Sequence, residues 1–106
     1  MSTRATIAVR RDDGSFVATY LHFDGYPEHA GKLLMANYQN TEQAETLIAG
    51  GDIRCLDTKM GEPEYFEDGR PPVELKTQSD LLDFVRDCGA QHVYLFANGA
   101  WEHKQL

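Results

Sequence analysis

The densest group of chemically active side chains lies between residues 22 and 29, in the sequence HFDGYPEH. Imidazole and carboxylate groups can transfer protons or bind a metal, and a phenol can stack on a ring or donate a hydrogen bond. Loops at the ends of strands are common places for such sites. We therefore predict a ligand- or partner-binding segment formed by His22, Asp24, Tyr26, Glu28 and His29, together with Arg4.

A structural role for this segment is the competing interpretation. Asp24 and Gly25 are common turn residues, and His22 would then be a satisfied histidine at the edge of the core. An enzymatic alternative is a small hydrolase or metal-dependent enzyme that uses His22, Asp24 and His29. The chain has no His-Glu-x-x-His or Cys-x-x-Cys pattern, so we expect no metal and no cofactor, and we favour a non-enzymatic protein.

The two cysteines are weak candidates for a nucleophile. Cys88 falls on the apolar stripe of an expected helix, which is typical of an inert core thiol. Cys55 follows Arg54, whose charge could lower the thiol pKa, but it lies in an apolar strand-like pattern. The chain also lacks a nucleophile elbow and a phosphate-binding glycine loop.

The charge of the chain limits its partners. The 106 residues, enough for one domain, carry a net charge of −7, which disfavours direct binding to nucleic acid or to an anionic membrane. The chain contains no apolar run long enough to suggest a membrane span, so we expect a cytoplasmic protein. An acidic face would suit a basic partner, with a solvated surface as the alternative. The acids expected there are Glu62, Glu64, Glu67, Asp68, Glu74, Asp80, Asp83 and Asp87.

A β-hairpin is expected at the start of the chain. Residues 3–11 alternate between core-facing apolar and more polar types, residues 12–15 form a turn, and residues 16–23 form a second strand. Closure on Asp13-Gly14 would place Ala5 opposite His22 and Ile7 opposite Tyr20. His22 would then end the core-facing row.

Two helices should follow this hairpin. Pro27 is suited to the first position of a helix that runs to about Tyr38. Asn40 and Gln43 resemble a capping box for a shorter helix that ends at Gly50-Gly51, and residues 52–56 suit a short strand.

Residues 57–76 form a long, irregular, acidic segment with three of the four prolines. A structureless stretch of this length predicts a functional loop, a flap or an unrecognised hairpin. Tyr65-Phe66 beside Asp68-Gly69 favours a small hairpin here.

The end of the chain carries the strongest local signals. A third helix starts at Thr77 or Ser79 and ends at Gly89. Asn98-Gly99 then predicts a type I′ turn between strands 92–97 and 100–104, which pairs Phe96 with Trp101 and Tyr94 with His103. This aromatic face would pack in the core or form a homodimer surface. Predicted interface residues are Tyr65, Phe66 and Trp101.

The order of these elements, β-β-α-α-(β)-α-β-β, predicts an α+β domain over residues 1–106. We expect a mainly antiparallel sheet of four or five strands with helices on one face.

Several segments resemble a family of small phage and prophage proteins of unassigned function. They are residues 2–9 (STRATIAV), 22–28 (HFDGYPE), 31–34 (GKLL), 47–48, 51–53 (GDI), and the closing 94–96 and 101. Residues 57–76 depart from the more basic, histidine-containing stretch expected of that family. The resemblance implies a phage accessory protein in the host cytoplasm. Small acidic phage proteins often inhibit host defence, including CRISPR systems, by binding a defence protein or by sequestering a nucleotide signal.

Overall fold

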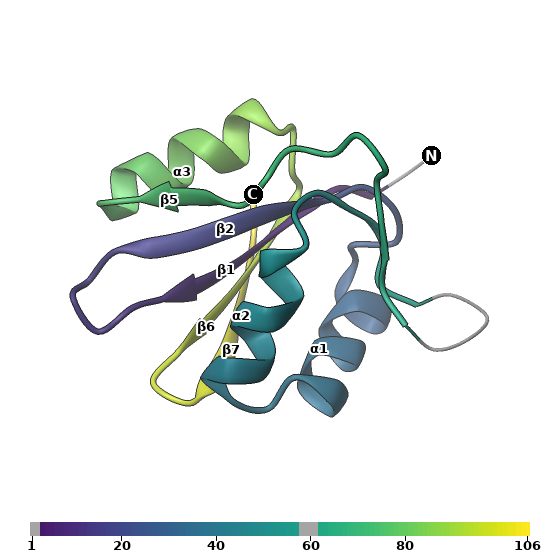
Figure 1. Cartoon of the computed structure of the whole chain (residues 1–106), viewed down its shortest axis with the longest axis horizontal. Helices are drawn as coiled ribbons and strands as arrows, with labels where there is room; N and C mark the ends of the chain where they lie inside the picture. Colours follow the sequence, from purple (N-terminus) through teal and green to yellow (C-terminus); the bar gives the residue numbers. More distant parts are fainter. Residues whose placement is uncertain (1–2, 58–61) are drawn as a thin grey trace.

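The computed structural model describes residues 3–57 and 62–106. Ser2 of the family-like opening and residues 58–61 of the acidic segment lie outside the described residues. The elements, shown in Figure 1, are β1 (Ala5–Arg10), β2 (Phe16–Leu21), the π-helical turn η1 (Pro27–Gly31), α1 (Lys32–Asn37), α2 (Thr41–Ala49), β3 (Ile53–Cys55), β4 (Glu64–Tyr65), β5 (Val73–Leu75), α3 (Gln78–Asp87), β6 (His92–Ala97) and β7 (Ala100–Gln105).

The sheet is mixed rather than mainly antiparallel. Its strand order is β4-β3-β2-β1-β6-β7, and β5 pairs with the first half of β2. The pairs β1–β6 and β2–β3 are parallel, whereas the others are antiparallel. The α+β class is confirmed, but the predicted four or five strands, their order and their orientation are wrong. Helical connections return the chain in the same direction, which produces the parallel pairs.

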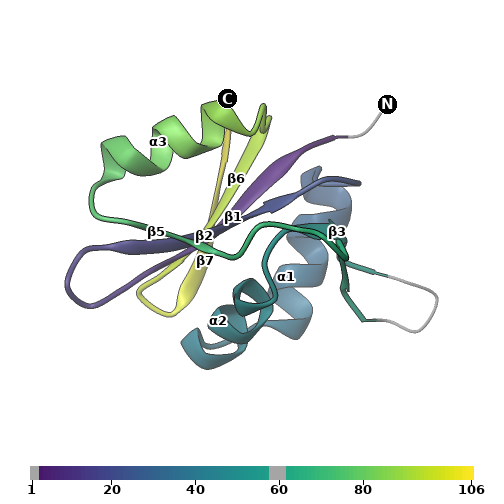
Figure 2. The same cartoon turned by 45° about the horizontal axis from the view of Figure 1, so that its top comes forward.

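Helices cover both faces of the sheet, so the predicted one-sided arrangement is also wrong. Figure 2 shows α3 on one side and α1 with α2 on the other. The reason lies in β1, where Thr6 and Ala8 are fully buried on the face that their alternation suggested was polar. Ala8 and Ala18 are small, which leaves room for Leu81 and Val85 of α3 in a second core.

The hairpin between β1 and β2 closes one residue away from the predicted register. Ala5 lies opposite Leu21, and Ile7 lies opposite Thr19. The five-residue loop from Arg11 to Ser15 closes with a 2.7 Å hydrogen bond from the Arg11 N–H to the Ser15 carbonyl. A slip of one residue moves every side chain to the other face, so His22 does not extend the row of the main core.

Local capping accounts for the helix boundaries. Pro27 begins the helical segment as predicted, but that segment is divided into η1 and α1. The Asn40 side chain accepts a hydrogen bond from the Gln43 N–H at 2.8 Å. The Gln43 side chain accepts from Gln39 instead of Asn40, so the predicted capping box is only half formed. At the start of α3, Thr77 and Asp80 form a complete capping box.

The described residues of the acidic segment form two separate short strands. Because β4 pairs with β3 and β5 pairs with β2, the described residues of the segment do not form the predicted local hairpin. Tyr65 packs against the main core, and its hydroxyl donates to the Leu47 carbonyl at 2.6 Å. Long-range pairing of this kind leaves no periodic signal in such short strands.

The C-terminal hairpin forms in the predicted register. Phe96 lies opposite Trp101, and Tyr94 lies opposite His103. Asn98 has a φ of 54° and Gly99 a φ of 78°, as a type I′ turn requires. The side chains of Tyr94 and Phe96 are buried in the main core, so this part of the aromatic face packs inward.

Candidate functional site

The segment from His22 to Pro27 is held mainly by its backbone. The N–H of His22 donates to the Ile53 carbonyl at 2.9 Å, and the N–H of Gly25 donates to the Thr3 carbonyl at 2.8 Å. The buried Tyr94 hydroxyl donates to the Gly25 carbonyl at 2.7 Å. A Cβ at Gly25 would stand 2.8 Å from the Ala5 Cβ, so only glycine fits without a local shift. The segment therefore ties the start of β1 to β3 and β6.

The side chains of this segment are divided between separate clusters. His22 Nδ1 lies 2.6 Å from the Tyr20 hydroxyl, and the His22 ring contacts Phe66 edge-on. Tyr26, which is 38% exposed, lies beside His29 with 5.9 Å between ring centroids. The geometry thus supports a structural role for the backbone and does not assemble these side chains into one pocket.

The other predicted binding residues have separate surroundings. Asp24 is exposed and adopts a φ of 57°, in the left-handed region that suits a turn. The exposed Arg4 lies beside Gly89 after α3, where a Cβ would stand 3.1 Å from the guanidinium. Glu28 lies in the first turn of η1, and its carboxylate raises the pKa of Tyr94 as a cause secondary to burial.

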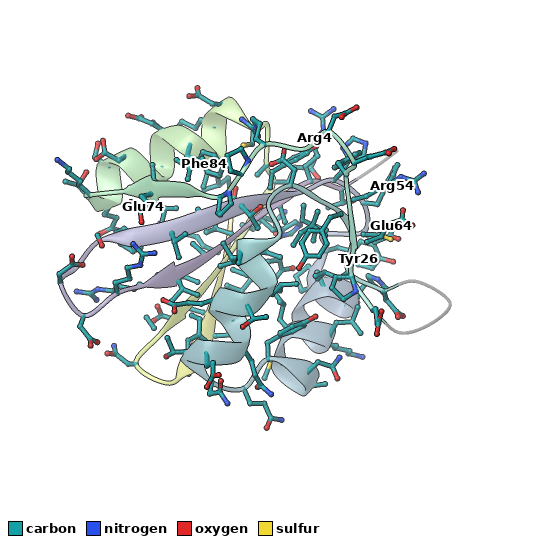
Figure 3. All side chains as sticks on the ribbon, in the orientation of Figure 1. Arg4, Tyr26, Arg54, Glu64, Glu74 and Phe84 are labelled. Carbon is teal, nitrogen blue, oxygen red and sulfur yellow. The ribbon has the colours of Figure 1, made fainter. Side chains whose placement is uncertain are left out.

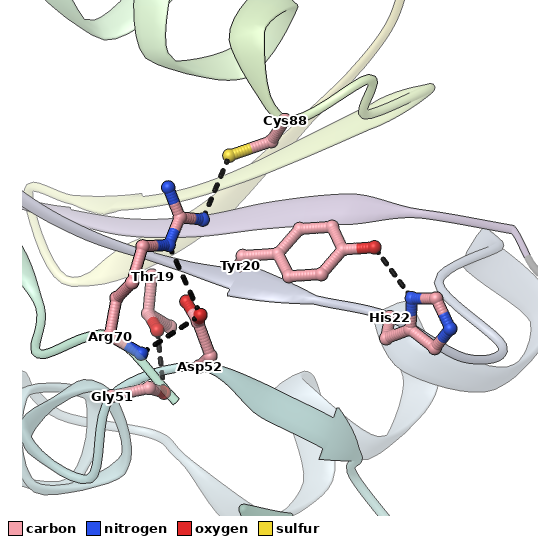
Figure 4. A network of polar contacts seen from close by, with 7 residues as sticks. All are labelled: Thr19, Tyr20, His22, Gly51, Asp52, Arg70 and Cys88. Atoms are coloured by element: carbon pink, nitrogen blue, oxygen red, sulfur yellow. Dashed lines mark hydrogen bonds and ion pairs between the residues drawn. The ribbon is translucent and has the colours of Figure 1, made fainter. Parts of the chain in front are cut away.

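A polar network that the sequence did not indicate joins distant segments (Figure 4). Both the backbone N–H and the Nε of Arg70 donate to Asp52 Oδ2, at 3.0 and 3.2 Å. An Arg70 terminal nitrogen lies 3.6 Å from the Cys88 sulfur, and the guanidinium lies over the Phe84 ring. These contacts hold the acidic segment against the connection between α2 and β3 and against the end of α3.

The surroundings of both cysteines disfavour the thiolate. Burial raises the pKa of the Cys88 thiol, although the hydrogen bond from Arg70 acts in the opposite direction. Burial also raises the pKa of Cys55, and the Arg54 charge offsets only part of that effect. Since the thiolate is the reactive form, neither site is organised as an activated nucleophile.

The donor groups do not converge on a metal-binding geometry. Among residues 3–57 and 62–106, no group of three or more His, Cys, Asp or Glu side chains could hold a metal ion. His92 and His103 do meet as a pair, with 2.8 Å between Nδ1 and Nε2. Within the same described ranges, no helix has the length and apolar character needed to cross a membrane.

An acidic groove of about 330 Å³ runs between β5 and α3, and we use this name for it below. The positions 80, 83 and 87 repeat at helical spacing and place three carboxylates on the outer face of α3. Glu74 and Phe84 approach the groove from the strand and the helix (Figure 3). The lining residues are Glu74, Leu75, Lys76, Asp80, Asp83, Phe84 and Asp87.

Part of the predicted acidic face lies outside this groove. Glu64 is paired with Arg54 at 2.5 Å on the β3–β4 ribbon. Glu62, Glu67 and Asp68 are exposed residues of the acidic segment. The tertiary structure therefore concentrates the four groove carboxylates and separates them from the remaining acids.

A second polar groove, of about 620 Å³, lies where the two hairpin turns meet α2. Arg10 and Arg11 line it, but so do Asp12 and Glu45. Arg11 is already engaged by Glu74 at 2.8 Å and by Glu45 at 4.0 Å. An anionic ligand would have to compete with these carboxylates, so the groove is poorly suited to a nucleotide.

Comparisons with protein-family models, with curated proteins and with solved structures found no match to this chain.

Proposed function

We propose that this protein is a small, non-catalytic phage accessory protein that inhibits a bacterial defence protein by binding to a basic surface of it. The acidic groove between β5 and α3 carries this proposal. It is lined by four carboxylates and one lysine, together with Phe84. Glu74 is paired with Arg11, and Asp80 accepts a hydrogen bond from the Thr77 N–H in the cap of α3. The proposal therefore relies on Asp83 and Asp87. Such a groove favours a partner with a basic surface, because complementary charges speed association and like charges disfavour acidic partners.

The phage and host-defence context of the proposal rests on the resemblance of residues 22–28 and 31–34 to small phage proteins. The backbone role of the first segment is consistent with that resemblance, because the turn at Gly25 joins three parts of the fold. The binding surface itself is then free to differ within such a family. In this chain it combines the acidic segment with α3.

The test is a pull-down from bacterial lysate at low and high salt. We expect the wild-type chain to retain a basic protein at low salt and to lose most of it at high salt, since exposed charges are screened. Replacement of Asp83 and Asp87 by Asn should weaken the interaction about 2- to 30-fold, as loss of two exposed ion pairs would. The matched control replaces the exposed acids Glu67 and Asp68 by Gln and Asn, and should retain the partner.

Two outcomes would contradict the proposal. One is recovery of no partner at low salt. The other is equal weakening by the groove variant and the control variant, which would indicate a general effect of net charge. Sequestration of a nucleotide signal, the other mechanism considered, predicts thermal stabilisation by cyclic or linear nucleotides. Stabilisation that persists in the groove variant would favour that mechanism instead.

A further inference from the structure

The six-residue strand β7 lies at one end of the described sheet, and its outer edge is not paired with another strand there. The strands at the other free edges are shorter, with three residues in β5 and two in β4. A strand edge presents backbone donors and acceptors that can pair with another chain. The length of β7 makes it the best template for such pairing among the described strands.

The hairpin register determines which backbone groups face outward. The two-residue turn makes Ala97 and Ala100 a hydrogen-bonded pair, and such pairs alternate along an antiparallel ribbon. The 2.9 Å bond from the Leu106 N–H to the Gln91 carbonyl follows the same alternation. The outward backbone groups therefore belong to Trp101, His103 and Gln105.

We infer that two copies of this chain form a dimer by antiparallel pairing of their β7 strands, with His103 opposite His103 at the two-fold axis. In this register Trp101 and Gln105 also form hydrogen-bonded pairs across the interface. Glu102 of each copy then lies opposite Lys104 of the other. These are non-hydrogen-bonded positions, where cross-strand side chains approach most closely.

The charges of β7 select this register over its neighbours. A shift centred on residue 102 would place Glu102 opposite Glu102, and a shift centred on residue 104 would place Lys104 opposite Lys104. Like charges directly opposite each other are destabilising. The net charge of the chain is −7, but Glu102 and Lys104 balance each other, so two copies can meet here with little repulsion.

The surface beside β7 is partly apolar, which favours a contact. A groove of about 290 Å³ lies between α3 and the β6–β7 hairpin. Leu82 and Val93 contribute to its lining, together with Glu102 and Lys104. The partner strand would extend this surface and continue the sheet through both copies.

The molecular mass in solution tests the inference. It is measured by analytical ultracentrifugation at protein concentrations from micromolar to about 1 mM. We expect a species of about 24 kDa, twice the 12.0 kDa of the chain. Glu102→Lys and Lys104→Glu should each be monomeric, because each places like charges opposite each other. Lys32→Glu, an equal charge change at an exposed position of α1, should remain dimeric.

Mixing provides the decisive measurement. Lys104→Glu carries two acids on β7 and Glu102→Lys carries two bases, so an equimolar mixture of the two monomers should form a heterodimer. Circular dichroism of each variant shows that it is folded. A single-chain mass for the wild type at every concentration would overturn the inference. So would a dimer that survives in both single variants, or a mixture of folded variants that stays monomeric.

Discussion

Removal of one hydroxyl group, in Tyr94→Phe, tests whether the His22–Pro27 segment is a structural link. The Tyr94 side chain is 2% exposed, and its hydroxyl donates to the Gly25 carbonyl at 2.7 Å. The variant leaves that buried carbonyl without this donor, which costs about 1–3 kcal/mol. For a domain of this size, we expect a Tm lower by about 4–15 °C.

The pH dependence of stability reports on the burial of the same hydroxyl group. Burial, followed by the nearby Glu28 carboxylate, raises the pKa of Tyr94 to about 12. In the unfolded chain the phenol ionises near pH 10, so the neutral phenol stabilises the fold fully below that pH. The contribution, on the order of 2–3 kcal/mol, is lost as the pH rises from about 10 to 12.

Urea denaturation of both proteins at pH 8 and pH 11 measures these effects. The wild type should be more stable at pH 8, and the difference from Tyr94→Phe should shrink at pH 11. Tyr38→Phe is the matched control at pH 8, since Tyr38 is only partly buried against the core. At that pH it should change stability by less than about 0.5 kcal/mol. A Tyr94→Phe variant as stable as the wild type at pH 8 would refute the structural role of this bond.

Two further changes test the interior of the sheet. Thr6→Val should raise the free energy of unfolding by about 1 kcal/mol in a urea titration, because the fully buried Thr6 hydroxyl has no hydrogen-bond partner among the described residues; a loss of stability would contradict this. Burial, and then the neighbouring His103, lowers the pKa of His92. The neutral imidazole therefore stabilises the fold above about pH 6.5, and this contribution is lost as the pH falls further. His92→Gln should flatten that part of the pH–stability curve, and an unchanged curve would argue against the effect.

Prediction from the sequence was most successful where the residues of one short segment determine its local structure. Asn98-Gly99 sets the turn and hence the pairing of Tyr94 with His103, because positive φ angles and strand alternation act locally. Thr77 and Ser79 were both candidate caps for the third helix, and Thr77 makes the cap of α3. The acids of the third helix were also expected to contribute to an acidic face, and Asp80, Asp83 and Asp87 line the acidic groove.

Only the tertiary structure could place the strand side of the acidic groove. Glu74 reaches the acidic groove because β5 pairs with β2, more than 50 residues earlier in the chain. The network of Asp52, Arg70 and Cys88 depends on the same path of the acidic segment. Short strands such as β5 carry too few residues to show a period, so no local pattern indicated these contacts.

The sequence by itself determined an acidic α+β domain, its three α-helical regions and its C-terminal hairpin, because composition, caps and turn residues act over a few positions. The tertiary structure decided the parallel pairs, the second core under α3 and the separation of His22 from Tyr26. The second core depends on burial on both sides of β1, where Thr6 and Ala8 resemble surface residues in the sequence but are fully buried in the fold. One residue of register in the first hairpin then decided which face received His22.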